Sequence, residues 1–229
     1  MDKKLISFIF VAAVFVFAAT AVLIQRASRE AAPVPVQPAP AAAPAKSAQT
    51  YSNSQYSFFF HYPDPFILAG PQDNPIPYVV NNYFIRHGAV VVSAAIPKST
   101  YVGTNFQSAF ITFAVDSVTA NNENCKEYTD YQTTNDPANE LGYRSLPMVQ
   151  TRTVGETIYY YAELADAVAG TRSMTRVYHL LKNKICYEAS LNLFTTNIAN
   201  YDPGQVTAVD EMAVWQRLEN VLATLKFSP

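Results

Sequence analysis

The side chains that could carry chemistry are few in this 229-residue sequence, and three of them fall in consecutive predicted strands. Glu163 and Glu188 lie in two of these strands, and His179 lies in the strand between them. If the strands are neighbours in matching phase, the three side chains share one face of a sheet. Paired carboxylates can serve acid–base catalysis or bind a cation. The alternation alone also predicts a solvated polar face, and we favour that simpler interpretation.

Established catalytic and metal-binding patterns are absent from the sequence. The remaining histidines are His61 and His87, and none of the three has a metal-binding spacing such as HExxH. No GxSxG, SxxK or Gly-rich phosphate loop occurs. We therefore predict no metal site, no cofactor and no enzymatic activity. A cell-envelope hydrolase that uses Glu163 or Glu188 is the alternative.

The sequence contains two cysteines, Cys125 and Cys186. An even pair in an oxidising compartment predicts a single disulfide. The bridge would close a loop of about 62 residues, for which the chain-entropy estimate of stabilisation is roughly 4 kcal/mol. The alternative is a pair of unrelated buried thiols in a reducing compartment.

An apolar run at residues 5–24 predicts an N-terminal transmembrane anchor, so that residues 1–24 form a signal-anchor. Lys3 and Lys4 precede the run, and such basic residues tend to stay in the cytoplasm. The C-terminal part is then extracytoplasmic on a single-pass protein of the cell membrane. A cleaved signal peptide is the alternative, because Ala19-Thr20-Ala21 fits the cleavage pattern. The run exceeds the usual length of a signal core, which favours the anchor.

Residues 25–50 are rich in alanine and proline, and the remaining residues 51–229 have the length of one domain. Proline favours an extended polyproline II chain, which predicts a semi-rigid stalk between membrane and domain. Low-complexity filler is the alternative. The prolines of this linker are Pro33, Pro35, Pro38, Pro40 and Pro44.

Period-two alternation and aromatic content predict a sheet-rich domain that ends in a helix. In the strand at residues 185–195, the apolar odd-numbered residues from 185 to 193 point one way, and Cys186, Glu188, Ser190 and Asn192 point the other. The predicted fold class is α+β, with an antiparallel sheet packed by a C-terminal amphipathic helix. A capping box is predicted at residues 207–210. The other predicted strands span residues 56–62, 89–96, 110–118, 148–154, 157–164 and 173–181, and the helical stripe comprises Val209, Met212, Trp215, Leu218, Leu222 and Leu225.

Two segments at the ends of the predicted domain resemble PsbP-like domains. Residues 56–63 have the aromatic opening that closes on Tyr62-Pro63, and the long amphipathic helix runs into residues 223–227, as such domains do. The resemblance leaves the middle of the domain unmatched. It implies an antiparallel sheet with helices on both faces, in an accessory or interaction module. Neither segment contains a functional residue that the resemblance could assign.

Composition narrows the class of partner. A net charge of −2 with 15% charged residues gives no electrostatic footprint for nucleic acid. Clusters at Thr195-Thr196-Asn197 and Thr133-Thr134-Asn135 could line a polar groove for a glycan or peptide, although such clusters also form turns. We therefore predict a membrane-anchored binding or assembly module that faces an envelope protein or glycan. A small-ligand carrier with an apolar cavity beneath the helix is a further alternative.

Overall fold

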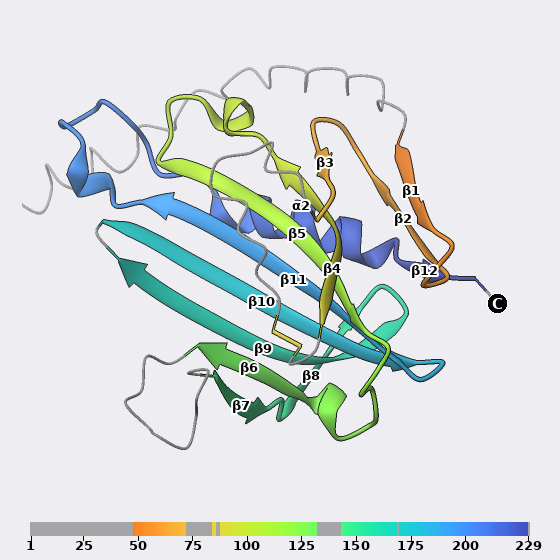
Figure 1. Cartoon of the computed structure of the whole chain (residues 1–229). Coiled ribbons are helices and arrows are strands. Elements are labelled where there is room, and N and C mark those ends of the chain that lie inside the picture. Colours follow the sequence, from red (N-terminus) through yellow and green to blue (C-terminus); the bar gives the residue numbers. More distant parts are fainter. Residues whose placement is uncertain (1–47, 72–83, 86–87, 132–142, 169, 229) are drawn as a thin grey trace, which may run out of the picture. The chain divides into compact units, whose positions relative to one another are not determined.

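The part of the chain that can be described begins shortly before the predicted domain. The computed structural model (Figure 1) describes residues 48–71, 84–85, 88–131, 143–168 and 170–228. The predicted anchor at residues 1–24, nearly all of the linker, the cluster at 133–135 and His87 lie outside these residues. Within the described ranges, no helix has both the length and the apolar character needed to cross a membrane.

One large antiparallel sheet organises the described residues. Its seven strands follow the order β3-β4-β5-β11-β10-β9-β8 (Figure 1). Neighbours in the second half of the chain are joined by tight turns, so each strand pairs with the next along the sequence. The strands are β3 (Ile67–Ala69), β4 (Ala89–Ile96), β5 (Phe106–Asp116), β8 (Gln150–Val154), β9 (Thr157–Val168), β10 (Thr171–Lys182) and β11 (Ile185–Thr196).

Two small sheets and one α-helix complete the described fold. The first small sheet joins β1 (Gln49–Asn53), β2 (Phe58–Tyr62) and β12 (Lys226–Phe227), and the second pairs β6 (Glu127–Tyr131) with β7 (Tyr143–Pro147). The helix α2 spans Glu211–Ala223. Short 3-10 turns are η1 (Lys98–Tyr101), η2 (Asn124–Lys126) and η3 (Ile198–Asn200).

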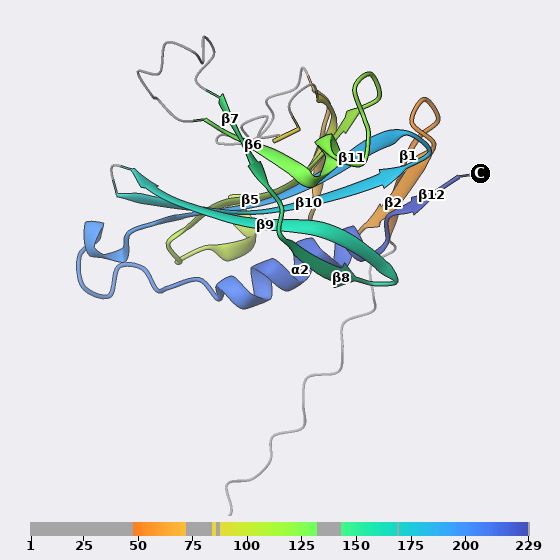
Figure 2. The same cartoon turned by 90° about the horizontal axis from the view of Figure 1, so that it is seen from below.

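The prediction of an α+β domain is wrong. The described residues are mostly strands, and α2 is the one α-helix among them. Figure 2 shows α2 on one side of the large sheet, whereas β6 and β7 lie on the other, so no α-helix among the described residues covers that second side. The sequence prediction missed β1, β6 and β7 because they are short and lack period-two alternation of apolar residues.

The apolar core lies between the large sheet and α2. The odd-numbered side chains of β11, including Leu191 and Leu193, enter this core as the alternation predicted. The small β1-β2-β12 sheet packs on the same side, where the Phe60 ring stacks on Phe113 with centroids 4.5 Å apart. We call this side of the large sheet the helix face, and Leu191 and Phe113 define it.

The helix begins three residues later than the predicted capping box implies. The Asp210 side chain accepts a hydrogen bond from the backbone N–H of Ala213 at 3.1 Å and caps the first turn. Met212 was predicted in the buried stripe, but it lies on the flank of α2 and is 74% exposed. The buried stripe of the helix is Val214, Trp215, Leu218, Val221 and Leu222.

The substitution Leu218→Ala should lower the free energy of unfolding by about 2–5 kcal/mol, because it removes a fully buried side chain and leaves a cavity. Met212→Ala is the matched control on the same helix, and we expect a change near zero. Urea unfolding followed by circular dichroism measures both. Equal losses for the two variants would contradict the packing described for α2.

Candidate functional site

The face of the large sheet opposite to α2 is polar, yet it is buried. We call it the buried polar face. The prediction of a solvated face is therefore wrong for its central strands, where Glu188 is 1% exposed and His179 is fully buried. Hydrogen bonds within the face include Ser93 to Thr112 at 2.9 Å. The buried polar side chains of this face are Ser93, Ser108, Thr112, Asp116, Thr175, His179, Glu188, Ser190 and Asn192.

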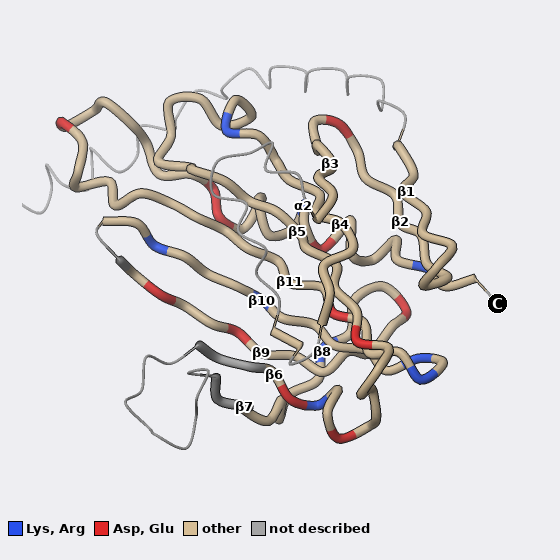
Figure 3. The backbone as a smooth tube through the Cα atoms, in the orientation of Figure 1, with Lys and Arg blue, Asp and Glu red and all other residues tan. Residues whose placement is uncertain are grey.

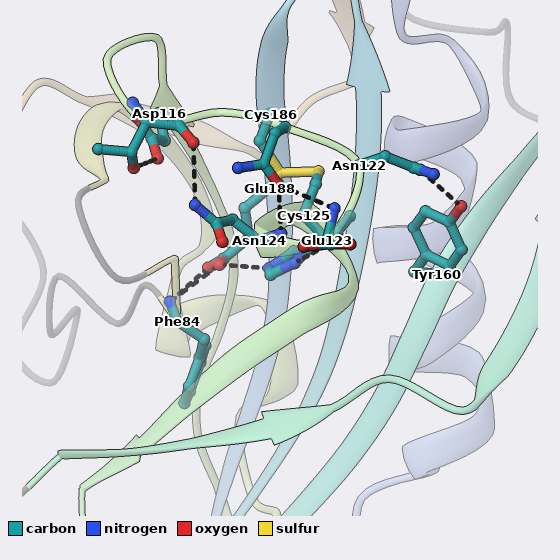
Figure 4. Close-up of a disulfide and its surroundings, with 12 residues drawn as sticks. Phe84, Asp116, Asn122, Glu123, Asn124, Cys125, Tyr160, Cys186 and Glu188 are labelled. Atoms are coloured by element: carbon teal, nitrogen blue, oxygen red, sulfur yellow. Dashed lines mark hydrogen bonds and ion pairs between the residues drawn. A yellow bond between two sulfur atoms is a disulfide. The ribbon is translucent and has the colours of Figure 1, made fainter.

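His179 and Glu188 form a buried pair on this face. They are register partners in β10 and β11, and His179 Nε2 lies 2.7 Å from Glu188 Oε2. The backbone N–H of Phe84 donates to both carboxylate oxygens at 2.9 Å (Figure 4). The carboxylate is thus held from two directions, by the neighbouring strand and by a segment that is distant in sequence.

The second ring nitrogen of His179 also faces an acceptor. Nδ1 lies 3.2 Å from the backbone carbonyl oxygen of Cys125. A carbonyl and a carboxylate can only accept, so both contacts are hydrogen bonds only when both ring nitrogens carry a hydrogen. Both ring nitrogens therefore lie within reach of an acceptor, and His179 and Glu188 form a buried polar pair. Breaking such a pair by removing one partner is strongly destabilising.

The two cysteines are joined beside this pair. Cys125 in η2 and Cys186 at the start of β11 form a disulfide between residues 61 positions apart, in agreement with the predicted pairing. Both cysteines are buried and pack against Ile85. The disulfide (Figure 4) fixes η2 on the sheet, and it thereby holds the Cys125 carbonyl next to His179.

Glu163 does not join this site. It pairs in register with Arg176, which is three residues from His179 and therefore points to the opposite face of the sheet. On that face Glu163 accepts a hydrogen bond from the Tyr161 hydroxyl at 2.6 Å. The structure thus brings together His179 and Glu188, but it separates Glu163 from both. The three side chains could share a face only if their strands were in matching phase, and the phase of Glu163 differs from that of His179 and Glu188.

A network of charged and phenolic groups lies on the helix face. Glu219 of α2 accepts hydrogen bonds from Arg176 at 2.8 Å and from the Tyr178 hydroxyl at 3.0 Å, and it forms an ion pair with Arg152 at 2.9 Å. The Arg176 guanidinium also lies over the ring of Trp215, 4.2 Å from its centroid. These contacts attach α2 to β8 and β10. We interpret the network as structural, because Glu219 is the shared partner of Arg152, Arg176 and Tyr178.

A cleft of about 430 Å³ lies near the ends of β9 and β10. Thr195, Thr196 and Asn197 line it, and the Asn197 side chain also accepts a hydrogen bond from the Ala199 N–H in the turn η3, which is the turn role that the sequence analysis gave as the alternative. Several of its polar groups already have partners within the chain. Asn105 donates to the Thr196 carbonyl at 2.8 Å, and its side-chain oxygen accepts from the Val209 backbone N–H at 2.9 Å.

The outer edge of β9 has unpaired length. β8 pairs only with residues 157–161, so residues 162–168 of β9 extend beyond it, and no described strand pairs with that side. Glu163, Ala165, Asp166 and Ala167 are exposed along this edge. Figure 3 shows the two acidic positions along β9. The sequence prediction ended this strand at residue 164 and so missed most of the edge.

Comparisons with known proteins do not assign the chain to a family. No family model matches the sequence, and no curated protein matches it. A solved structure from Bacteroides thetaiotaomicron is similar with a TM-score of 0.42 and 12% identity, over 79% of this chain and 48% of that one. This chain therefore spans about half the length of the Bacteroides protein.

The cyanobacterial PsbP structure from Synechocystis is similar with a TM-score of 0.32 and 11% identity, over 85% of this chain and 99% of that one. At these TM-scores, neither likeness establishes a common family or a function.

The disulfide should contribute substantially to stability. Reduction should lower the free energy of unfolding by about 4 kcal/mol, because the unfolded chain regains the entropy that the cross-link removed. Oxidised protein should resist thiol alkylation even in denaturant, until a reductant is added. Mass spectrometry counts the alkylated cysteines. Two modified thiols without reductant would contradict the disulfide.

The buried tyrosines of the helix face predict alkaline sensitivity. Burial raises the pKa of Tyr159 and Tyr161 to about 12, and it also raises the pKa of Tyr178. Tyrosines of the unfolded chain ionise near pH 10, so the unfolded state releases protons first. Stability should be fully present below about pH 10 and should fall as pH rises toward 12, by up to about 1.4 kcal/mol per pH unit for each tyrosine.

Urea unfolding at several alkaline pH values measures this dependence, and tyrosinate absorbance reports ionisation. Tyr178→Phe should flatten the alkaline decline. Tyr160→Phe is the matched control, because Tyr160 lies on the opposite side of β9 and is only partly buried. If the free energy of unfolding fell with pH as steeply in Tyr178→Phe as in the wild type, ionisation of Tyr178 would not be a cause of the alkaline decline.

Proposed function

We propose that the chain is an extracytoplasmic binding module that accepts an extended peptide segment of an envelope protein as an added strand beside β9. The observation that carries this proposal is the outer edge of residues 162–168, which extends past the end of β8. The disulfide supports the extracytoplasmic location, because such bridges persist in oxidising compartments. The proposal gives a specific form to the predicted binding or assembly role.

A strand edge is suited to this role for a simple physical reason. The outward backbone N–H and C=O groups of an edge strand can form a ladder with an extended chain, and alternate side chains then supply specificity. At Ala167 the backbone N–H already donates to the Asp166 side chain at 2.7 Å, so the ladder would begin before that residue. The acidic side chains of Glu163 and Asp166 favour a partner segment that carries lysine or arginine. The same charges discourage pairing between two copies of this edge, because like charges would face each other.

The cleft extends the proposed surface. Ala167 belongs both to the β9 edge and to the lining of the cleft, and Arg172 and Glu211 form an ion pair in the lining at 3.2 Å. A peptide paired along β9 would therefore enter the cleft with the residues that lie beside the end of the strand near residue 168. Thr171 lies in the lining at that place.

Two alternatives find less support in the geometry. A hydrolase that uses Glu163 or Glu188 would gain support from a pocket that encloses both carboxylates, whereas the two residues lie on opposite faces of the sheet. A carrier needs an apolar cavity beneath α2, and Trp215, Leu218 and Leu222 are packed into the core at that position.

Site-directed crosslinking tests the proposed edge. A photoreactive amino acid at position 165, introduced into the full chain in its own membranes, should crosslink to one extended segment of an envelope protein. The same group at position 212, on the exposed flank of α2, is the matched control and should not capture that segment. Mass spectrometry of the crosslinked peptides identifies the partner sequence.

Charge reversal at the edge provides the second arm of this test. Asp166→Lys should reduce the crosslink yield several-fold, since it places a cation opposite the basic partner segment. Asp202→Lys makes the same change in charge at an exposed position away from the edge and should leave the yield unchanged. Equal capture from positions 165 and 212, or no effect of Asp166→Lys, would overturn the proposal.

A further inference from the structure

The surroundings of the disulfide contain the ligands of a metal site. The sulfur atoms of Cys125 and Cys186 and a ring nitrogen of His179 all lie within 4.8 Å of one another, and all three residues are buried. We propose that the reduced form of the chain binds one zinc ion through these three residues. The site is independent of the strand edge and goes beyond the proposed binding function.

The donor set fits zinc. Two thiolates and one imidazole are common ligands of Zn²⁺, with Zn–S distances of about 2.3 Å and Zn–N distances of about 2.0–2.1 Å. In a tetrahedral site these lengths place the donor atoms roughly 3.5–3.8 Å apart. The observed cluster is already within 4.8 Å, so small side-chain rotations would bring the donors into place once the two sulfurs separate.

The surroundings of His179 fit a metal ligand as well. Glu188 holds Nε2 at 2.7 Å, so a metal would bind Nδ1 and replace the contact of that nitrogen with the Cys125 carbonyl. Nδ1 is also the nitrogen beside Cys125, because it lies 3.2 Å from the Cys125 carbonyl. A carboxylate on the far nitrogen is the usual partner of a zinc-bound histidine, where it fixes the ring and raises its basicity. Glu188 is itself fixed by the Phe84 N–H.

The disulfide and the metal exclude each other, because both use the same sulfur atoms. A dithiol reductant would give two electrons and two protons to the bridge, so that the S–S bond breaks, two thiols form and the reductant becomes a disulfide. Zinc binding then displaces both thiol protons, and Nδ1 binds the metal through its lone pair. The charges of Zn²⁺ and the two thiolates then cancel, and the Glu188 carboxylate lies beside this neutral group.

The disulfide form and the reduced, zinc-bound form would connect the same elements by different bonds. The disulfide joins η2 to β11, and a zinc ion on the three residues would join η2 to both β10 and β11. A chain that has not yet met an oxidant could therefore be stabilised by the metal at the same place. Bound metal should also protect both thiols from alkylation and delay formation of the disulfide.

Metal titration of the reduced full chain tests the inference. The protein is reduced in denaturant, refolded under anaerobic conditions in a phosphine reductant, and titrated with Co²⁺ and then Zn²⁺. We expect one cobalt per chain, with the thiolate charge-transfer and intense d–d absorption of tetrahedral cobalt, and displacement of both signals by zinc. Zinc should raise the melting temperature of the reduced protein but not of the oxidised protein.

Two substitutions separate the proposed site from adventitious binding. Glu188→Gln keeps the size of the side chain and should weaken metal affinity about 10–100-fold, as loss of such an outer partner usually does. His61→Gln removes a histidine on β2, remote from the disulfide, and should leave affinity unchanged. Each variant is compared with and without zinc, so its own stability cancels.

A reduced wild-type chain that shows no tetrahedral cobalt spectrum and no rise in melting temperature with zinc would overturn the inference. Equal affinity of wild type and Glu188→Gln would do the same. Neither outcome bears on the strand edge of β9, whose crosslinks are measured on the oxidised chain.

Discussion

The central physical constraint of this fold is that β11 is buried on both faces. A sheet that is buried on one face can leave the polar side chains of its other face in water. In this fold, polar residues such as Glu188 and Asn192 are buried as well. A buried polar group without a hydrogen-bond partner costs about 1–3 kcal/mol, and an unpaired charge costs more. The arrangement of the strands around β11 is therefore limited to registers that supply partners.

The observed register supplies most of these partners from adjacent strands. Thr175 of β10 donates to Asn192 at 2.8 Å, and Asn192 in turn donates to the Ser190 carbonyl at 3.1 Å. A shift of one residue would turn these side chains into the apolar core and leave both faces mismatched. Among the described buried side chains of this face, the Ser108 hydroxyl is an exception without a partner. The polar face therefore specifies the register as strictly as the apolar face does.

Much of the large sheet follows from the sequence because alternation is a local property. β4 and the start of β9 agree with the predicted bounds, and β11 has its apolar and polar residues on the predicted faces. Alternation does not reveal what covers a face, so it predicted water where the structure has a second buried layer. It also predicted that His179 and Glu188 could be neighbours, which the register confirms.

The other differences between the predicted and observed structure depend on strand lengths and on the pairing register, which a local sequence pattern does not contain. The phase of Glu163 is fixed by its pairing with Arg176 across a turn, and a shift of one residue decides its face. The free edge of β9 exists because β8 is the shorter strand, and a pattern in either strand alone cannot show this. Met212 has helical spacing relative to Trp215, but its side chain lies on the flank of the buried stripe.

The burial of β11 also explains why the cysteines lie where they do. A buried pair such as His179 and Glu188 is tolerated only when all its hydrogen-bonding groups are held in place, and desolvation makes any looseness expensive. One of these partners, the Cys125 carbonyl, belongs to the short 3-10 turn η2, in which Cys125 is the buried residue. A covalent bond from that residue to Cys186, two positions from Glu188 on the same face, holds the carbonyl at the required place. The cross-link and the polar pair thus depend on each other, and any ligand that replaced the cross-link would have to hold the same turn against the same face.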